Sequence, residues 1–287
     1  MTDPGAPFWV PSAALQHHVN RTVSGSPEVD WLSHLRATHL PAQVGRALVV
    51  GCGEGHVERA LARAGGAREI LGIDADTAAV GRARRHAEGR GLAYIGYAQF
   101  NPRSQELPPG PWDALFVIDT LHHAFGAEDL LRRCHDALAP RGRFVMLEYV
   151  GPNRFQHPDD RMEIVQRYFR LLPERLRRGP LTGRIPARRE LPDAAGLARA
   201  LPREAARSEE LLHLARTTFA EEALMPAGGG LIHPLLSGLE SNFGGDPAGE
   251  ERILAVLGEA EARFSAQGLL PDAFALFVGR RRSGATG

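Results

Sequence analysis

Residues 47–55 read Ala47-Leu48-Val49-Val50-Gly51-Cys52-Gly53-Glu54-Gly55, an apolar run followed by three alternating glycines. An unbroken apolar run of this length is typical of a parallel strand that is buried on both faces. Glycines directly after such a strand allow a tight turn into a helix, and they leave main-chain N–H groups open to a ligand. The stretch therefore predicts a strand, a ligand-binding loop and a helix, in that order.

The alternation of strand and helix continues on the C-terminal side of this stretch. Apolar runs predict further strands over 69–73, 92–99, 113–118 and 143–149, and helical patterns separate them at 57–64, 77–88 and 127–138. Pro140-Arg141-Gly142 predicts a turn before the fifth strand, and strand patterns return at 217–225 and 273–278. This rhythm predicts an α/β fold, with a mostly parallel sheet and helices on both faces.

The predicted chain has four parts. Residues 1–40 form an N-terminal helical segment, 41–151 the core that carries the glycine loop, 152–215 a helical insertion rich in arginine and proline, and 216–282 the remainder of the core sheet. Open α/β sheets bind ligands at the carboxyl ends of their strands. We therefore expect the N-terminal segment and the insertion to cover that edge as a lid.

Composition narrows the class of protein. The chain has 287 residues, 43% of them hydrophobic, which is enough for a substantial core. Lys and Arg total 34, as do Asp and Glu, so no net charge attracts nucleic acid or an anionic membrane. The sequence has no apolar run of membrane-spanning length and no signal-peptide pattern at 1–9, so we expect a cytoplasmic location.

Two residue counts exclude particular chemistries. The chain contains no lysine, which excludes Schiff-base catalysis and a lysine general base. It contains two cysteines, Cys52 and Cys134, whose number and spacing indicate neither a disulfide framework nor a zinc cluster.

The spacing of the glycines bears on the kind of ligand. A dinucleotide-binding loop reads Gly-x-Gly-x-x-Gly, whereas here the third glycine comes one residue early and His56 takes its place. The early glycine favours a ligand without phosphates. Asp74 ends the next predicted strand, where a carboxylate can accept hydrogen bonds from both hydroxyls of a ribose. The alternative is an ordinary strand-to-helix turn with Asp74 as a helix cap.

Four parts of the chain resemble class I S-adenosylmethionine-dependent methyltransferases: the strand and loop at 48–55, Asp74, the segment 113–123, and Leu138-Ala139-Pro140-Arg141-Gly142. The resemblance covers roughly residues 45–150 and, more loosely, the two C-terminal strand patterns. It implies a Rossmann-like, seven-stranded, mostly parallel sheet whose last strand, here 273–278, is antiparallel. It also implies the cofactor S-adenosyl-L-methionine and the product S-adenosyl-L-homocysteine.

The same resemblance implies which residues bind the cofactor. By position, Gly51, Cys52, Gly53 and Gly55 line its methionine end and Asp74 holds the ribose, while Ala75, Gln99, Phe100 and Asp119 complete the predicted set. Two positions depart from the family pattern. Val49 stands where many members have an acid, and Gln99 stands where many have an acid that contacts the adenine amine. The amide oxygen of a glutamine can still accept from that amine.

Four residues are candidates for catalysis. His122 and His123 follow the fourth predicted strand, and a histidine there can remove a proton from an acceptor hydroxyl or amine near neutral pH. The alternative is that the pair caps a helix or fills a wall. Tyr149 ends the fifth strand, either facing the pocket or packed beneath a loop. His233 precedes Pro234 in a glycine-rich approach to a helix, where it is a further pocket candidate.

We expect no metal site. His122, His123 and His135 lie close in sequence, but adjacent side chains point in different directions and no carboxylate stands at ligand spacing. Chelators are therefore expected to leave activity unchanged.

The leading hypothesis is methyl transfer to a small molecule, such as a natural product, a sugar or a related metabolite. Segments 148–156 and 228–236 loosely resemble a bacterial subgroup often found near genes for glycan or natural-product assembly. One alternative keeps the fold and cofactor in a cyclase or an accessory subunit. Protein or nucleic-acid methylation is less favoured, because the arginines at 175–189 are interspersed with Glu and Pro, as on a solvated helical face. The expected partner is the small-molecule acceptor, with no nucleic acid and no membrane, and a homodimer is compatible with the sequence.

Overall fold

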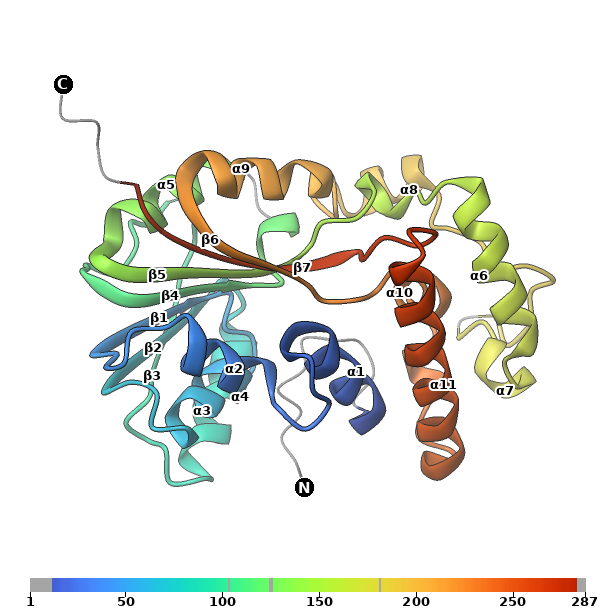
Figure 1. The fold of residues 1–287 in the computed structure, drawn as a ribbon, viewed down its shortest axis with the longest axis horizontal. Coiled ribbons are helices and arrows are strands. Elements are labelled where there is room, and N and C mark those ends of the chain that lie inside the picture. The colour runs from blue at the N-terminus through green and yellow to red at the C-terminus, as the bar shows by residue number, and fades with distance from the viewer. Residues whose placement is uncertain (1–11, 103, 124–125, 181, 283–287) are drawn as a thin grey trace.

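The computed structural model describes residues 12–282, apart from 103, 124–125 and 181. The first 11 residues of the expected lid lie outside this description. Seven strands form one sheet, and they are β1 (Arg46–Val50), β2 (Glu69–Asp74), β3 (Gly96–Gln99), β4 (Trp112–Ile118), β5 (Leu138–Tyr149), β6 (Phe219–Pro226) and β7 (Phe274–Arg281). The sheet runs edge to edge in the order β3-β2-β1-β4-β5-β7-β6 (Figure 1).

The sheet topology confirms the Rossmann-like expectation. Strands β1 to β5 are parallel, and β7 pairs antiparallel with both β5 and β6. The strand order reverses between β1 and β4, where Val50 pairs with Ile73 on one side and with Val117 on the other. In open α/β sheets, a ligand binds outside the carboxyl ends of the strands at such a reversal. The glycine loop after β1 and Asp119 after β4 therefore flank the expected binding crevice.

Helices cover both faces of the sheet. They are α1 (Ala13–Ser24), α2 (Trp31–Thr38), α3 (His56–Arg63), α4 (Thr77–Glu88), α5 (Ala127–Ala137), α6 (Asp159–Leu171), α7 (Glu174–Arg177), α8 (Ala194–Ala200), α9 (Leu211–Thr218), α10 (Ile232–Leu236) and α11 (Pro247–Ala266). Alternate residues of β1 show the two faces: Val49 packs in the cluster that includes α2 and α4, whereas Leu48 packs in the cluster that includes α5 and α9. The sequence reads as a continuous apolar run because both sides are buried.

One local prediction was wrong. The turn expected at 140–142 belongs to an irregular part of β5 instead. Trp112 pairs with Leu138, but Ala114 pairs with Arg143. The β5 residues between Leu138 and Arg143 therefore stand opposite the single β4 residue between Trp112 and Ala114. Such an irregularity lets a strand bend without leaving the sheet.

A third apolar cluster lies beyond the sheet and is built mainly from helices. It joins α6, α10 and α11, through residues such as Phe169, Leu235 and Leu254 (Figure 1). The helical insertion therefore splits in two. Its N-terminal part packs with α10 and α11, and residues 201–207 reach the carboxyl edge of the sheet. None of the helices in the described part of the chain combines the length and apolarity needed to span a membrane.

Helix α1 is fixed to this helical cluster by a buried ion pair. His18 Nε2 lies 2.7 Å from Glu261 Oε1 of α11, and the two side chains are 7% and 1% exposed. Burial by itself raises the pKa of the Glu261 carboxyl, but the hydrogen bond from His18 and the backbone N–H groups of Ile232 and Gly229 lower it overall. Helix α1 is thus packed against α11, as Figure 1 shows.

Candidate functional site

The glycine loop approaches its neighbours too closely for side chains at two positions. A Cβ on Gly51 would lie 1.7 Å from Oγ1 of Thr120, which follows β4, and the φ of Gly51 is +77°. A Cβ on Gly55 would lie 2.4 Å from the hydroxyl of Tyr97, at a φ of +79°. Both positions therefore require glycine, for sterics as well as for backbone conformation.

Asp74 holds the loop from the end of β2. Its Oδ2 accepts a hydrogen bond from the backbone N–H of Gly53 at 2.9 Å, and its Oδ1 accepts one from the N–H of Asp76 at 2.8 Å. Each carboxylate oxygen has a second lone pair, so both remain able to accept from a ligand. Asp74 is half-buried at the wall of the crevice.

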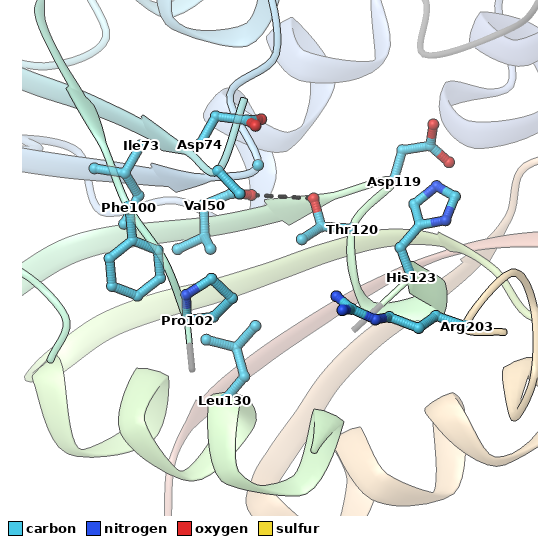
Figure 2. A pocket seen from close by; sticks show the side chains of 12 residues that line it. Val50, Ile73, Asp74, Phe100, Pro102, Asp119, Thr120, His123, Leu130 and Arg203 are labelled. Carbon is cyan, nitrogen blue, oxygen red and sulfur yellow. Dashed lines mark hydrogen bonds between the residues drawn. The ribbon is translucent and has the colours of Figure 1, made fainter. Parts of the chain in front are cut away.

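Two adjoining cavities, of about 240 and 260 Å³, share Gly51, Asp74, Asp119 and Thr120. Together they fall in the range of small-molecule sites. In the first, one side is apolar, with Phe100, Pro102 and Leu130, and the other side is polar, with Asp119, His123 and Arg203 (Figure 2). The second extends under the loop along Cys52, Gly53 and His56.

Seven of the nine predicted cofactor-binding residues line one of these cavities, and they are Gly51, Cys52, Gly53, Asp74, Ala75, Phe100 and Asp119. Gly55 and Gln99 line neither cavity. Gly55 packs over Tyr97, and Gln99 is exposed at the end of β3. The adenine contact expected of Gln99 is therefore not supported. The next residue, Phe100, faces the cavity instead, because neighbouring residues at a strand end point to opposite sides.

His122 does not have the properties of a general base. Its Nδ1 lies 2.7 Å from Oε2 of Glu148, which is completely buried, and its own side chain is 6% exposed. Burial lowers the pKa of His122, but the hydrogen bond to Glu148 and the charges of Glu148 and Asp119 outweigh it and raise the pKa to about 9. A histidine that holds its proton at neutral pH cannot accept another. The role of general base predicted for His122 is therefore not supported.

Glu148 also anchors the segment that follows β4. Its Oε1 accepts hydrogen bonds from the backbone N–H groups of Thr120 at 2.6 Å and of Leu121 at 2.7 Å. Asp119, directly before them, adopts a φ of +50°, which is strained for a residue with a side chain. Its side chain is 47% exposed, yet desolvation by the surrounding chain raises its pKa to about 6. The buried carboxylate of Glu148 thus fixes the segment that forms the polar side of the cavity.

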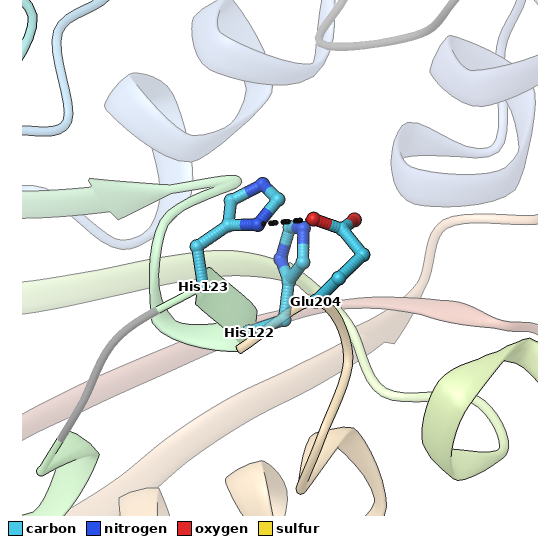
Figure 3. A group of neighbouring side chains, drawn as sticks. All are labelled: His122, His123 and Glu204. Carbon is cyan, nitrogen blue, oxygen red and sulfur yellow. Dashed lines mark ion pairs between the residues drawn. The ribbon is translucent and has the colours of Figure 1, made fainter. Parts of the chain in front are cut away.

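Of the four predicted catalytic residues, His123 is the one that lines the cavities. Its side chain is 47% exposed, and its Nδ1 lies 2.8 Å from Oε2 of Glu204 (Figure 3). Glu204 comes from the part of the insertion that reaches the sheet edge. Burial raises the pKa of the Glu204 carboxyl, but His123 lowers it overall. This pair presents an imidazole to the cavity.

Tyr149 and His233 lie elsewhere, in a buried aromatic cluster. Their ring centroids are 5.1 Å apart, and Phe155 and Phe274 pack against both. The Tyr149 hydroxyl donates to the backbone oxygen of Pro152. Burial raises the pKa of Tyr149 and lowers that of His233 to about 3. Tyr149 packs beneath the loop, and the predicted catalytic roles of these two residues are not supported.

Neither of the two reasons for expecting no metal site holds in the structure. The rings of His122 and His123 do not diverge, since their centroids are 3.8 Å apart. Three carboxylates that are distant in sequence, or on a different turn, also surround the pair, and they are Asp119, Glu148 and Glu204. The spacing along the chain could not reveal Glu148 and Glu204, because Glu148 belongs to another strand and Glu204 to the insertion.

Comparison with known proteins places the central part of the chain. Residues 47–142 match the family model described as a methyltransferase domain. The matched residues run from β1 into β5, so this part of the chain is similar to methyltransferase domains. One relative, described below, is named as S-adenosyl-L-methionine-dependent, which agrees with a loop whose third glycine comes one residue early.

Individual relatives agree with the family and differ in what they do. The chain is 32% identical over 158 residues to trans-aconitate 2-methyltransferase of Streptomyces coelicolor, covering 55% of this chain and 49% of that one. It is 36% identical over 107 residues to an S-adenosyl-L-methionine-dependent Diels-Alderase, iccD, of Talaromyces variabilis, covering 36% of each. The chain therefore spans about half or less of the length of these relatives.

A solved structure shows the same fold over nearly the whole chain. The crystal structure of the [4+2]-cyclase SpnF superposes with a TM-score of 0.53 at 18% identity, covering 95% of this chain and 94% of that one. At this identity, the likeness speaks for the fold alone.

Reasoning from sequence missed three residues of this candidate site. Thr120 fits against Gly51, Arg203 lines the cavity, and Glu204 pairs with His123. Thr120 lies in the segment with the histidines and could have been found there. Arg203 and Glu204 carry no sequence signal, because nothing in an Arg- and Glu-rich insertion singles them out.

A buried carboxyl beneath the loop predicts an unusual pH dependence of stability. Glu58 of α3 is completely buried, and neither of its carboxyl oxygens has a hydrogen-bond partner among the described residues. Desolvation raises its pKa from 4.5 to about 8. An acid whose pKa is raised by folding contributes most to the stability of the folded state at pH values below the pKa that it has in the unfolded chain. We therefore expect this contribution to be lost as the pH rises from 4.5 through about 8.

Glu58→Gln should remove this loss, because the amide does not ionise. Urea unfolding at about pH 5 and about pH 8.5 should show a smaller fall in stability for Glu58→Gln than for the natural chain. Glu88→Gln, on the exposed end of α4, is the matched control and should behave like the natural chain. An equal fall in Glu58→Gln and the natural chain would show that Glu58 is not the responsible group.

Proposed function

We propose that this chain transfers the methyl group of S-adenosylmethionine to a small-molecule acceptor, such as a natural product, a sugar or a related metabolite. One observation carries the proposal. The crevice at the strand reversal joins the glycine loop and Asp74 to a polar edge formed by Asp119, His123 and Arg203. A cofactor site and a site for a polar acceptor thus share one cavity.

The residues present fit the cofactor. Asp74 would accept from the ribose hydroxyls, and charge-assisted hydrogen bonds contribute about 1.5–3 kcal/mol each. The slot between Phe100, Pro102 and Leu130 suits the flat, apolar face of adenine. The space that Gly51 and Gly53 leave open suits the methionine end. When bound, the cofactor supplies an electrophilic methyl group, whose bond to sulfur breaks with its electron pair left on sulfur, giving S-adenosylhomocysteine.

The chain's own contribution is to position the acceptor and to exclude water. The nucleophilic atom would lie beside His123, on the polar edge that Glu148 and Glu204 hold in place. Alignment of two reactants in a site can supply several kcal/mol of the barrier, roughly 7–11 kcal/mol at best. Residues 202–207 of the insertion close one side of the crevice. They are the part of the predicted lid that we propose to keep water away.

Asp74→Ala should weaken S-adenosylhomocysteine binding roughly 10-fold or more, because each charge-assisted bond is worth about 1.5–3 kcal/mol. Calorimetry measures the change directly. Asp76→Ala is a close control. Asp76 caps α4 by accepting from Ala78 N–H, so its loss should cost about 1 kcal/mol of stability without changing cofactor affinity.

The natural chain should bind S-adenosylhomocysteine with a dissociation constant on the order of 10⁻⁶ M. It should bind NAD far more weakly. Tight NAD binding without S-adenosylhomocysteine binding would contradict the proposed cofactor. An unchanged affinity in Asp74→Ala would mean that other residues hold the ribose.

A non-methylating reaction is the second candidate. It is favoured by the relative named as a Diels-Alderase, whose similarity to this chain covers 107 residues. In such a reaction the cofactor would be bound but not consumed. Stoichiometric formation of S-adenosylhomocysteine during turnover of an acceptor supports methyl transfer, whereas turnover without it supports the second candidate.

A further inference from the structure

We propose that His122, His123 and Glu204 bind a divalent metal ion of the zinc class at the polar edge of the cavity, with Glu148 orienting His122. The ion would hold an oxygen of the acceptor. The metal site rests on the geometry of these side chains alone, whereas its part in catalysis also rests on the proposed methyl transfer.

Three ligand atoms from two segments converge at this place. One nitrogen of each histidine and one oxygen of Glu204 lie within 4.8 Å of one another. His123 Nδ1 and Glu204 Oε2 are 2.8 Å apart (Figure 3). Tetrahedral zinc bonds of about 2.0–2.2 Å to nitrogen and oxygen place neighbouring ligand atoms about 3.4 Å apart, so this pair would separate slightly to admit the ion. Small side-chain movements would therefore complete the site.

Glu148 has the position of a supporting carboxylate. Histidines that bind metals usually donate the other ring N–H to a carboxylate, which fixes the tautomer and the ring orientation. Glu148 Oε2 lies 2.7 Å from Nδ1 of His122 and is fully buried, and its other oxygen is held by two backbone N–H groups. This arrangement leaves Nε2 of His122 to face the cluster. A carboxylate fixed so rigidly orients the ring for a bond at Nε2.

The charge of the cluster also favours a cation. Three carboxylates, of Asp119, Glu148 and Glu204, surround two histidines that are neutral when they bind a metal. Asp119 Oδ1 lies 3.8 Å from Nε2 of His122, on the cavity side. A divalent ion bound here would lie among these carboxylates, whose negative charges attract a cation.

The ligand types select the kind of ion. Two imidazoles and one carboxylate suit zinc and other borderline ions, whereas magnesium and calcium prefer oxygen ligands. Three protein ligands leave a fourth position open, as in catalytic zinc sites. Because His123 lines the cavity, that position would face the proposed acceptor site. An acceptor hydroxyl bound there would lose its proton more readily.

The test is metal binding by the full chain after dialysis against EDTA. Zn²⁺ titration by calorimetry should show one site. Co²⁺ should give the visible absorption bands of a nitrogen- and oxygen-ligated ion. His123→Gln and Glu204→Gln should each lower the affinity at least about 10-fold, and Glu148→Gln about 10–100-fold, as expected for a supporting carboxylate.

His213→Gln, on the exposed face of α9, is the matched control and should bind Zn²⁺ like the natural chain. Urea unfolding of each variant reports whether it is folded. Absence of stoichiometric Zn²⁺ and Co²⁺ binding would overturn the metal site, as would unchanged affinity in folded His123→Gln and Glu204→Gln. Zn²⁺ binding without any methyl transfer would leave the site standing and count against the proposed function.

Discussion

Gly51→Ala is expected to destabilise the chain by about 2–5 kcal/mol and to abolish measurable S-adenosylhomocysteine binding. The positive φ of +77° costs an alanine about 1–2 kcal/mol. The added Cβ would lie 1.7 Å from Oγ1 of Thr120, and such overpacking costs roughly 1–3 kcal/mol more. Because Gly51 lies where both cavities meet, any movement that relieves the overlap distorts the cofactor site.

Two further variants separate strain from overlap. Gly65 has a φ of +60° and nothing within 4 Å of an added Cβ, so Gly65→Ala should show the backbone cost alone. Thr120→Gly removes the three atoms nearest to the added Cβ. In a double-mutant cycle, Gly51→Ala and Thr120→Gly should therefore cost less together than the sum of the two. Equal costs for Gly51→Ala and Gly65→Ala would show that the close approach to Thr120 is not important.

His18→Ala is expected to lower the free energy of unfolding by about 3 kcal/mol, because removal of one partner leaves a buried charge uncompensated. Glu261 is 1% exposed and would keep only its hydrogen bonds from Gly229, Leu231 and Ile232. Those bonds order the segment between β6 and α10. The loss should therefore be visible by urea unfolding and by hydrogen exchange in residues 227–232.

The neighbouring histidine provides the control. His17 is exposed on the same helix, so His17→Ala should change stability by no more than about 0.5 kcal/mol. If His18→Ala also proved harmless, α1 would be a loosely held cover, as first expected of the whole N-terminal segment. The strong effect that we expect would show that α1 is a structural part of the helical cluster.

The sequence by itself was sufficient for the core of the fold. The apolar run before Gly51 predicted β1, because a strand buried on both faces must be apolar at every position. The early third glycine and Asp74 favoured a ligand with a ribose and without phosphates, and the resemblance to class I methyltransferases implied which cofactor that is. The family comparison and the sheet order agree with both inferences.

The sequence was less informative about the polar edge. It singled out His122 and His123 but not which of them faces the cavity, since that depends on the three-residue helical turn after Thr120. It placed Tyr149 and His233 among the catalytic residues, although both pack in an aromatic cluster. Such burial depends on which elements pack together, and a local pattern does not contain that information.

Only the tertiary structure decided the electrostatics of the site. Glu148 reaches His122 from a neighbouring strand, and Glu204 reaches His123 from the insertion. Each histidine is thereby paired with a carboxylate that is distant from it in the sequence. Glycine loops and strand ends are specified locally, because steric limits act between near neighbours in the chain. The pKa values and ligand sets of buried groups are specified by charges a few ångströms away in space, and those can come from anywhere in the sequence.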